Sequence, residues 1–277
     1  MMNNSSDSPY CIRRIPDNFH ENNDLRFHPL LITEESKDWN LLKVWNESFF
    51  EKKYGHIKVK IRQSLPYELT RKNGGVHGNS TIKEYIDYSN SNHDEFPYYL
   101  DNWQFALDCP ELLGDYSVPC AFKSWHREFA NDIKEELRWI FIGTKNSGSP
   151  MHIDVHLTSA WNVLVTGRKV WKFYRPRYTH HVYEGCVDAF KPDYLKHPLF
   201  KDIESITIEQ KPGDIVYTPP GWWHQVQNLE KGISLTENFV NTSNWKVVYK
   251  YHELQSSVCL NSKKWADSIM NSHKNRK

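Results

Sequence analysis

The sequence predicts a mainly β protein of the sandwich or jelly-roll class, with helices before and after the β region. From Arg138 to Val240 the chain is a succession of short apolar or alternating runs. Gly- and Pro-containing turns separate these runs, as at Pro212-Gly213 and at 219–221. Helical patterns occur mainly outside this region. Many short strands punctuated in this way are typical of sandwiches and jelly rolls.

The first 137 residues mix helical and extended patterns. A helix is predicted over 45–54, ended by Gly55, because its apolar residues fall on one helical face. Alternation over 56–61 predicts a strand, and the Gly-rich residues 73–79 predict a loop. Further helices are predicted over 81–88 and 124–137.

The β region is predicted to supply the core strands. They are expected at 138–143, 151–156, 161–174, 205–210, 214–218, 223–229 and 233–240. The run 161–174 reads as a hairpin with Gly167-Arg168 as its two-residue turn, and 175–204 is less regular. Helices are predicted over 245–254 and 263–270. The chain therefore divides into an N-terminal region, 1–137, a β core, 138–240, and C-terminal helices, 241–277.

Composition restricts the class of protein. Of 277 residues, 39% are hydrophobic and 25% charged, and the formal net charge is +1, so nothing resembles the basic footprint of a nucleic-acid binder. The five cysteines are scattered and form no C-x-x-C pair, which favours a reducing compartment. No signal peptide and no membrane-spanning run is visible. We therefore expect an intracellular, soluble protein, cytoplasmic or, in a eukaryote, nuclear.

His152 and Asp154 form an H-x-D triplet in a strand-like segment, and His224 follows a turn downstream. On a strand, residues i and i+2 point to the same face, so both side chains of the triplet could bind one ion. Two histidines and one carboxylate on one face of a ferrous ion are the pattern of non-haem Fe(II) oxygenases. A solvent-facing His and Asp on an edge strand are the alternative reading of the triplet alone.

Two other H-x-acid triplets show that the triplet alone is weak evidence. His93 and Glu95 lie in a polar run that reads as a loop. His126 and Glu128 lie in a predicted helix, where residues two apart diverge by about 200°. Only the triplet at 152–154 combines a strand-like segment with a suitable downstream histidine.

Side-chain parity predicts a polar site inside the β core. If Thr166 pairs with Lys169 across the turn, then Asn162 shares a face with Lys169 and its apolar neighbours. A buried lysine is costly unless it meets an anion. The last strand carries a polar stripe made of Ser234, Thr236 and Asn238. Solvent exposure would explain that stripe equally well, but Lys169 and Thr236 together could bind a carboxylate.

The chain carries the motifs MHIDVHLTSAWN at 151–162, GRKVW at 167–171, KPGD at 211–214, PGWWH at 220–224, NL at 228–229 and TENF at 236–239. These motifs fall in register with those of the JmjC-domain 2-oxoglutarate oxygenases, which the chain resembles. The likeness is strongest over 138–240 and points to the group of protein lysyl hydroxylases and arginine demethylases. It implies a double-stranded β-helix, a cupin-like jelly roll, with α/β elements before it and helices after it.

The resemblance also implies a role for individual positions. The implied Fe(II) ligands are His152, Asp154 and His224. The distal carboxylate of the cosubstrate 2-oxoglutarate would be held by Lys169 and Thr236. Further groups near the cosubstrate and the metal are implied at Asn162, Asn238, Ser149 and Tyr99. His156 is expected to line the pocket or the surface, and 175–204 to border the substrate mouth.

The implied activity is oxidative decarboxylation of 2-oxoglutarate, with O2, coupled to hydroxylation of a substrate C–H. A protein or peptide side chain is the expected substrate, with lysine favoured. Demethylation of N-methyl lysine or arginine and hydroxylation of a small molecule or amino acid stay open. A non-catalytic, cupin-like binding module is the alternative from another class. No membrane partner is expected, and the C-terminal helices are a candidate homodimer surface.

Overall fold

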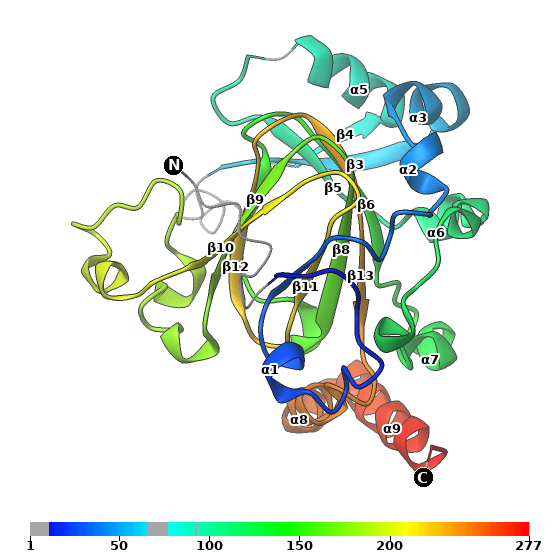
Figure 1. The fold of residues 1–277 in the computed structure, drawn as a ribbon, viewed down its shortest axis with the longest axis vertical. Coiled ribbons are helices and arrows are strands. Elements are labelled where there is room, and N and C mark those ends of the chain that lie inside the picture. Colours follow the sequence, from blue (N-terminus) through cyan, green and yellow to red (C-terminus); the bar gives the residue numbers. More distant parts are fainter. Residues whose placement is uncertain (1–10, 66–76, 92, 277) are drawn as a thin grey trace.

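Two β-sheets form the centre of the computed structural model, which describes residues 11–65, 77–91 and 93–276 (Figure 1). The larger sheet has the order β1 (Cys11–Ile12), β2 (Leu30–Ile32), β11 (Ile215–Thr218), β8 (Ser159–Thr166), β13 (Gly232–Phe239), β6 (Arg138–Gly143), β5 (Tyr98–Trp103), β3 (Lys58–Gln63) and β4 (His77–Thr81). The smaller sheet has the order β10 (Ile206–Gln210), β9 (Lys169–Tyr174), β12 (Trp223–Asn228) and β7 (Gly148–His152). The predicted jelly-roll class is confirmed.

The predicted hairpin over 161–174 is wrong. Strand β8 pairs with β11 and β13, whereas β9 pairs with β10 and β12, so the two strands belong to different sheets. Gly167, at φ +86°, lets the chain turn from one sheet to the other, and an added Cβ would lie 2.4 Å from the Lys231 carbonyl oxygen. The side chains expected to share one face instead face one another between the two sheets.

The N-terminal region contributes strands to both ends of the larger sheet. Strand β2 pairs with β11, and β5 joins β3 to β6. The sequence patterns did not predict β1, β2 or β5. The expected loop at 73–79 is wrong for 77–79, which begin β4 by pairing with β3, and 73–76 lie outside the described residues.

In the described residues, the helices before the β core are α1 (Asn23–Arg26), α2 (Leu41–Val44), α3 (Glu47–Tyr54), α5 (Ile82–Ser91), α6 (Phe105–Asp108) and α7 (His126–Ile133). Buried side chains of α2, α3, α5 and α6 belong to the apolar cluster of the larger sheet, whereas those of α7 pack against α8 and α9. The Asn46 side chain accepts from the Phe49 amide at the start of α3, and Gly55 caps its end. The helices predicted over 45–54, 81–88 and 124–137 correspond to α3, α5 and α7.

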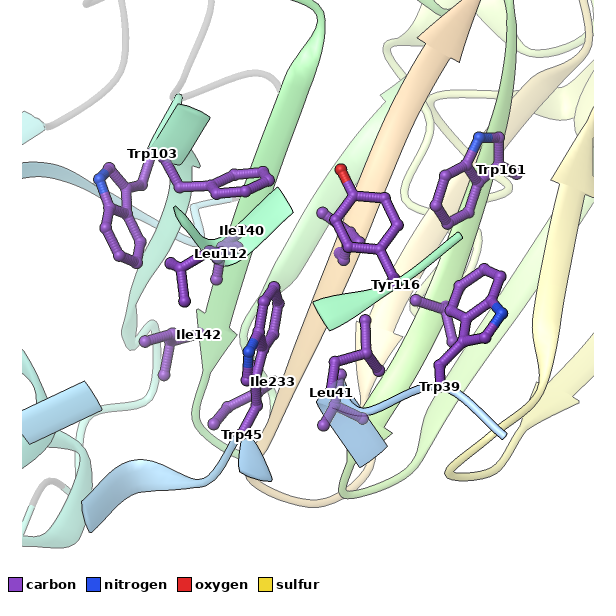
Figure 2. Packing of buried hydrophobic residues seen from close by; sticks show 14 of the residues in the cluster. Trp39, Leu41, Trp45, Trp103, Leu112, Tyr116, Ile140, Ile142, Trp161 and Ile233 are labelled. Carbon is purple, nitrogen blue, oxygen red and sulfur yellow. The ribbon is translucent and has the colours of Figure 1, made fainter. Parts of the chain in front are cut away.

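Aromatic and branched side chains fill the space between these helices and the sheet (Figure 2). Trp45 is 2% exposed, and its indole nitrogen donates to the Asp115 carboxylate at 2.8 Å. Trp39 meets Trp161 of β8 edge to face at 5.6 Å. Burial of each such side chain stabilises the fold by about 2–3 kcal/mol. This outer layer holds the larger sheet in place and leaves its other face to the site.

The chain ends in α8 (Trp245–Gln255) and α9 (Leu260–Lys274), close to α7 at one end of the sheets (Figure 1). Trp265 and Ile269 of α9 are fully buried in a cluster with side chains of α7 and α8. Residues 175–204 form short 3-10 turns beside the smaller sheet. No helix in the described residues is long and apolar enough to cross a bilayer.

Candidate metal and cosubstrate site

His152, Asp154 and His224 come together at the end of the smaller sheet. His152 is the last residue of β7 and lies directly opposite His224 of β12 in the strand register. The two imidazole rings are 4.1 Å apart between centroids. One ligand atom from each of the three residues lies within 4.8 Å of the others.

The predicted strand over 151–156 is wrong beyond His152. Strand β7 ends at His152, and 155–157 form a 3-10 turn, whereas Asp154 has φ −58° and ψ 148°, close to a polyproline II conformation. His156 and Leu157 have φ of 57° and 54°, and they turn the chain before β8. This turn lies directly after Asp154, whose carboxylate lies with the two imidazoles.

Backbone carbonyls orient both imidazoles. His152 Nδ1 lies 2.7 Å from the Pro150 carbonyl oxygen, and His224 Nδ1 lies 3.1 Å from that of Trp222. Donation from Nδ1 leaves each Nε2 as a lone-pair donor for a metal. Burial lowers the pKa of both histidines to about 4, so both rings are neutral at pH 7. Trp171 and Phe173 stack on His224 and hold its ring.

The carboxylate of Asp154 completes a donor set that fits a divalent metal. Its Oδ2 is buried and has no hydrogen-bond partner in the part of the chain that the structure describes. Burial raises the pKa of this carboxyl, although His152 and a hydrogen bond from Asn238 oppose the rise. A buried carboxylate oxygen without a partner is costly unless a cation meets it. Two neutral imidazoles and one carboxylate are the ligands of the facial iron triad.

A second polar group lies farther along the smaller sheet, around Lys169 of β9, which pairs with β12. Lys169 of β9 is 3% exposed, and its amine donates to Ser234 Oγ at 2.5 Å and Tyr99 Oη at 3.3 Å. No carboxylate pairs with this amine among the described residues, and burial lowers its pKa to about 7. In the register of β9 against β12, Lys169 lies opposite Asn228, and His224 lies opposite Phe173. Residues 224 and 228 are four apart on β12 and point to the same face of the sheet, so Lys169 and His224 face the same interior. The amine is therefore a preformed site for an anion.

The remaining predicted polar residues line the same interior. Asn162 Nδ2 donates to Thr236 Oγ1 at 2.7 Å, and Gln210 Nε2 donates to Asn162 Oδ1 at 3.1 Å. Asn238 Nδ2 donates to Thr158 Oγ1 at 2.9 Å. The stripe at Ser234, Thr236 and Asn238 is thus internal, and solvent exposure, the alternative reading, is wrong.

Two predicted positions stand apart from this group. Ser149 lies opposite Val226 in register and lines a surface cavity, with no hydrogen bond to Lys169 among the described residues. His156 does not line the pocket, because its ring turns toward α9 and bonds Glu135. Several residues between 186 and 197 line a cavity of about 400 Å³ beside β7, and the role of 175–204 at a substrate mouth stays a prediction.

Two groups that contact Lys169 or its neighbours received no role from the sequence, although Asn228 belongs to the motif at 228–229. Ser234 was noted in the polar stripe but not assigned to the lysine, because the two residues come from different sheets. Asn228 hydrogen-bonds Tyr99, which bonds the amine in turn. The register of β12 against β9 places Asn228 directly opposite Lys169. The available signal in the sequence was that Asn228 follows His224 by four residues, so that both side chains point to the same face of one strand.

The family of the chain follows from comparison with known proteins. A family model described as a cupin-like domain matches residues 16–246. The chain therefore belongs to the family of cupin-like domains, and the predicted resemblance to its JmjC members is confirmed by the relatives found.

Three relatives illustrate this branch of the family. The lysine-specific demethylase JMJ21 of Arabidopsis thaliana is 34% identical over 246 residues, which are 84% of this chain and 25% of the relative. The bifunctional arginine demethylase and lysyl-hydroxylase psr-1 of Caenorhabditis elegans is 31% identical over 80% of this chain and 58% of its own length. The 2-oxoglutarate and iron-dependent oxygenase JMJD4 of Danio rerio is 27% identical over 94% and 67%. The chain thus spans from a quarter to two thirds of these relatives.

Proposed function

We propose that this protein is an Fe(II)- and 2-oxoglutarate-dependent dioxygenase that hydroxylates a C–H bond of a polypeptide side chain, with lysine favoured. His152, Asp154 and His224 would hold the iron. Lys169 and Thr236 would hold the distal carboxylate of 2-oxoglutarate. The reaction consumes O2 and 2-oxoglutarate, and releases succinate and CO2.

One observation carries this proposal. The buried amine of Lys169, which pairs with no carboxylate among the described residues, shares the interior with three side chains that could bind a metal. Either group alone has other uses. A metal triad suits a hydrolase or a storage protein, and a buried lysine suits many anion sites. Their combination fits a small dianion with one carboxylate on Lys169 and its other end toward the triad. The name of JMJD4 says that it is a 2-oxoglutarate and iron-dependent oxygenase, which supports the same cosubstrate here.

Bound iron would supply the redox chemistry that activates O2, and the chain's own residues would bind and orient the reactants. The two imidazoles are held neutral by burial and directed by backbone carbonyls. Asn162 and Thr236, already bonded to each other, would offer an amide and a hydroxyl to the cosubstrate. Asn238, between Asp154 and Thr158, would steady the carboxylate ligand.

A polypeptide substrate is supported by the relatives and by the surface beside β7. Relatives are named as lysine- or arginine-specific demethylases and as a lysyl-hydroxylase. The cavity beside β7 is lined by both acidic and basic residues, among them Asp188 and Lys191, and by Met151 of β7, which precedes His152. Such a groove suits an extended polar chain better than a small apolar molecule.

Removal of an N-methyl group is the second candidate function, because the relatives' names include demethylases. Both outcomes use the same site and the same oxidation, since hydroxylation of an N-methyl carbon leads to loss of formaldehyde. They differ in the product. A peptide that gains one oxygen atom indicates hydroxylation, and one that loses a methyl group indicates demethylation.

The test is succinate formation by purified protein with ferrous iron, 2-oxoglutarate and air, with and without lysine- and methyl-arginine-containing peptides. We expect iron-dependent succinate that rises with a suitable peptide, and a changed peptide mass. His152→Ala should abolish turnover, whereas His56→Ala should leave it unchanged, because His56 is exposed in the turn between α3 and β3. A folded, iron-supplied protein that makes no succinate under any condition would favour the non-catalytic binding module.

A further inference from the structure

The loop that carries Asp154 is anchored from the far side of the molecule. Directly after this residue, His156 and Leu157 adopt left-handed backbone conformations, which cost non-glycine residues about 1 kcal/mol or more each. The His156 ring turns away from the triad, and its Nε2 donates to Glu135 Oε1 at 2.7 Å. The bend directly after Asp154 is therefore held by the His156 side chain, two residues after the carboxylate.

Glu135 connects this anchor to the C-terminal helix. Its other carboxylate oxygen, Oε2, accepts from the Trp265 indole nitrogen at 3.0 Å. Trp265 is fully buried, and its ring lies 4.9 Å from that of His156 and 4.8 Å from that of His252. Glu135 lies between the end of α7 and the start of β6. Its carboxylate thus joins the loop after Asp154 to α9.

We propose that Glu135 and Trp265 are positioning residues that fix Asp154 for metal binding, so that the C-terminal helices set the affinity of the iron site. This inference rests on the proposed function. Strained backbone persists only where surrounding contacts over-determine it. If the carboxylate of Glu135 is lost, the loop can relax toward ordinary backbone angles, and Asp154 then turns away from His152 and His224.

The helices α7 and α9 also offer a matched control. Glu128 of α7 accepts from Ser272 Oγ of α9 at 3.0 Å and pairs with Arg276 near the end of that helix. Glu128 joins α7 to α9, just as Glu135 joins the loop after α7 to α9, but Glu128 makes no hydrogen bond to His156. Replacing Glu128 should loosen the packing of α9 without releasing the loop.

The test is titration of the apo protein with Mn(II), followed by electron paramagnetic resonance of the free ion, for wild type, Glu135→Ala and Glu128→Ala. We expect Glu135→Ala to weaken Mn(II) binding about tenfold, as outer partners of metal ligands typically do. Glu128→Ala should bind like wild type. The Mn(II) affinity of Glu135→Gln should lie between those of wild type and Glu135→Ala, because the glutamine amide oxygen can accept one of the two hydrogen bonds. This variant replaces Glu135→Ala in the test if the alanine variant does not fold. Melting temperatures should fall comparably in both alanine variants.

Each outcome decides the matter. Equal Mn(II) affinity in wild type and the Glu135 variants would overturn the positioning role while leaving the proposed function intact. Equal weakening by Glu128→Ala would also overturn it, because general loosening of α9 would then be the cause. Failure of the wild-type protein to bind Mn(II) would instead overturn the proposed function, and the positioning role with it.

Discussion

Replacement of Lys169 by methionine should stabilise the protein while it destroys 2-oxoglutarate binding. The amine is 3% exposed and pairs with no carboxylate among the described residues. Without an anion, the folded state must hold this amine away from water, whereas the unfolded chain hydrates it. Methionine fills a similar volume with no charge. Stability and cosubstrate binding should therefore change in opposite directions.

The size of the gain follows from the pKa. Burial lowers the pKa of Lys169 from 10.5 to about 7, and each pKa unit equals about 1.4 kcal/mol, so the penalty at pH 7 is about 4 kcal/mol. Loss of the hydrogen bond between Lys169 and Ser234 reduces the expected gain in stability by about 1 kcal/mol. A net gain of about 3 kcal/mol corresponds to a rise in melting temperature of about 6 °C in a chain of this size.

The sign of the pH dependence provides a second readout. Between pH 7 and 10 the unfolded lysine holds a proton that the folded one has released, so wild-type stability from this group should rise with pH. Lys169→Met should lack that rise. The control is Lys172→Met on the same strand, because Lys172 donates to the Ala189 carbonyl at 2.7 Å and is only half-buried; it should not stabilise.

Differential scanning fluorimetry with and without 2-oxoglutarate and Mn(II) measures all of these effects. Wild type should melt higher with the cosubstrate, and Lys169→Met should melt higher without it but gain nothing on its addition. A methionine variant that melts at or below wild type without ligand would refute the energetic argument. One that still responds to 2-oxoglutarate would refute the assignment of the carboxylate site.

Three further changes test other parts of the site. Ser234→Ala removes one hydrogen-bond partner of the lysine and should weaken 2-oxoglutarate binding about fivefold by calorimetry. Asp154→Asn should abolish Mn(II) binding yet leave the apo protein at least as stable to heat, because it removes a buried charge without a hydrogen-bond partner at Oδ2. Gly148→Ala places a Cβ 2.0 Å from a carbonyl oxygen of β12 and should cost about 2–3 kcal/mol in urea unfolding. Gly114→Ala, with nothing within 4 Å, should change stability by less than about 0.5 kcal/mol and is its control.

The strands of the β core were predictable because their signals are local. Alternation and Gly or Pro turns place β6, β10, β11, β12 and β13 within one or two residues of the expected ranges. The partner of a strand is not a local property. Gly167 permits a turn either within one sheet or between two, and only the pairing of β8 with β11 and β13 decides which. For the same reason, the three-residue strand β2 was missed.

The candidate site was predictable in its members more than in its geometry. Parity along single strands correctly grouped Thr236 with Ser234 and Asn238. Beyond His152 the predicted strand does not form, because β7 ends there and left-handed residues at 156 and 157 redirect the chain. The division at 137 and 240 and a homodimer through the C-terminal helices stay predictions. Light scattering of the purified protein tests the dimer.

The polar interior is itself the strongest physical argument for a ligand between the sheets. Lys169 comes from the smaller sheet, and its partners Ser234 and Tyr99 come from the larger one. If these groups served only to join the sheets, apolar side chains of the same volume would do so with several kcal/mol more stability. A dianion that pairs with the amine and extends toward the triad removes that cost. The stability of Lys169→Met therefore measures how far this interior is built for binding and not for folding.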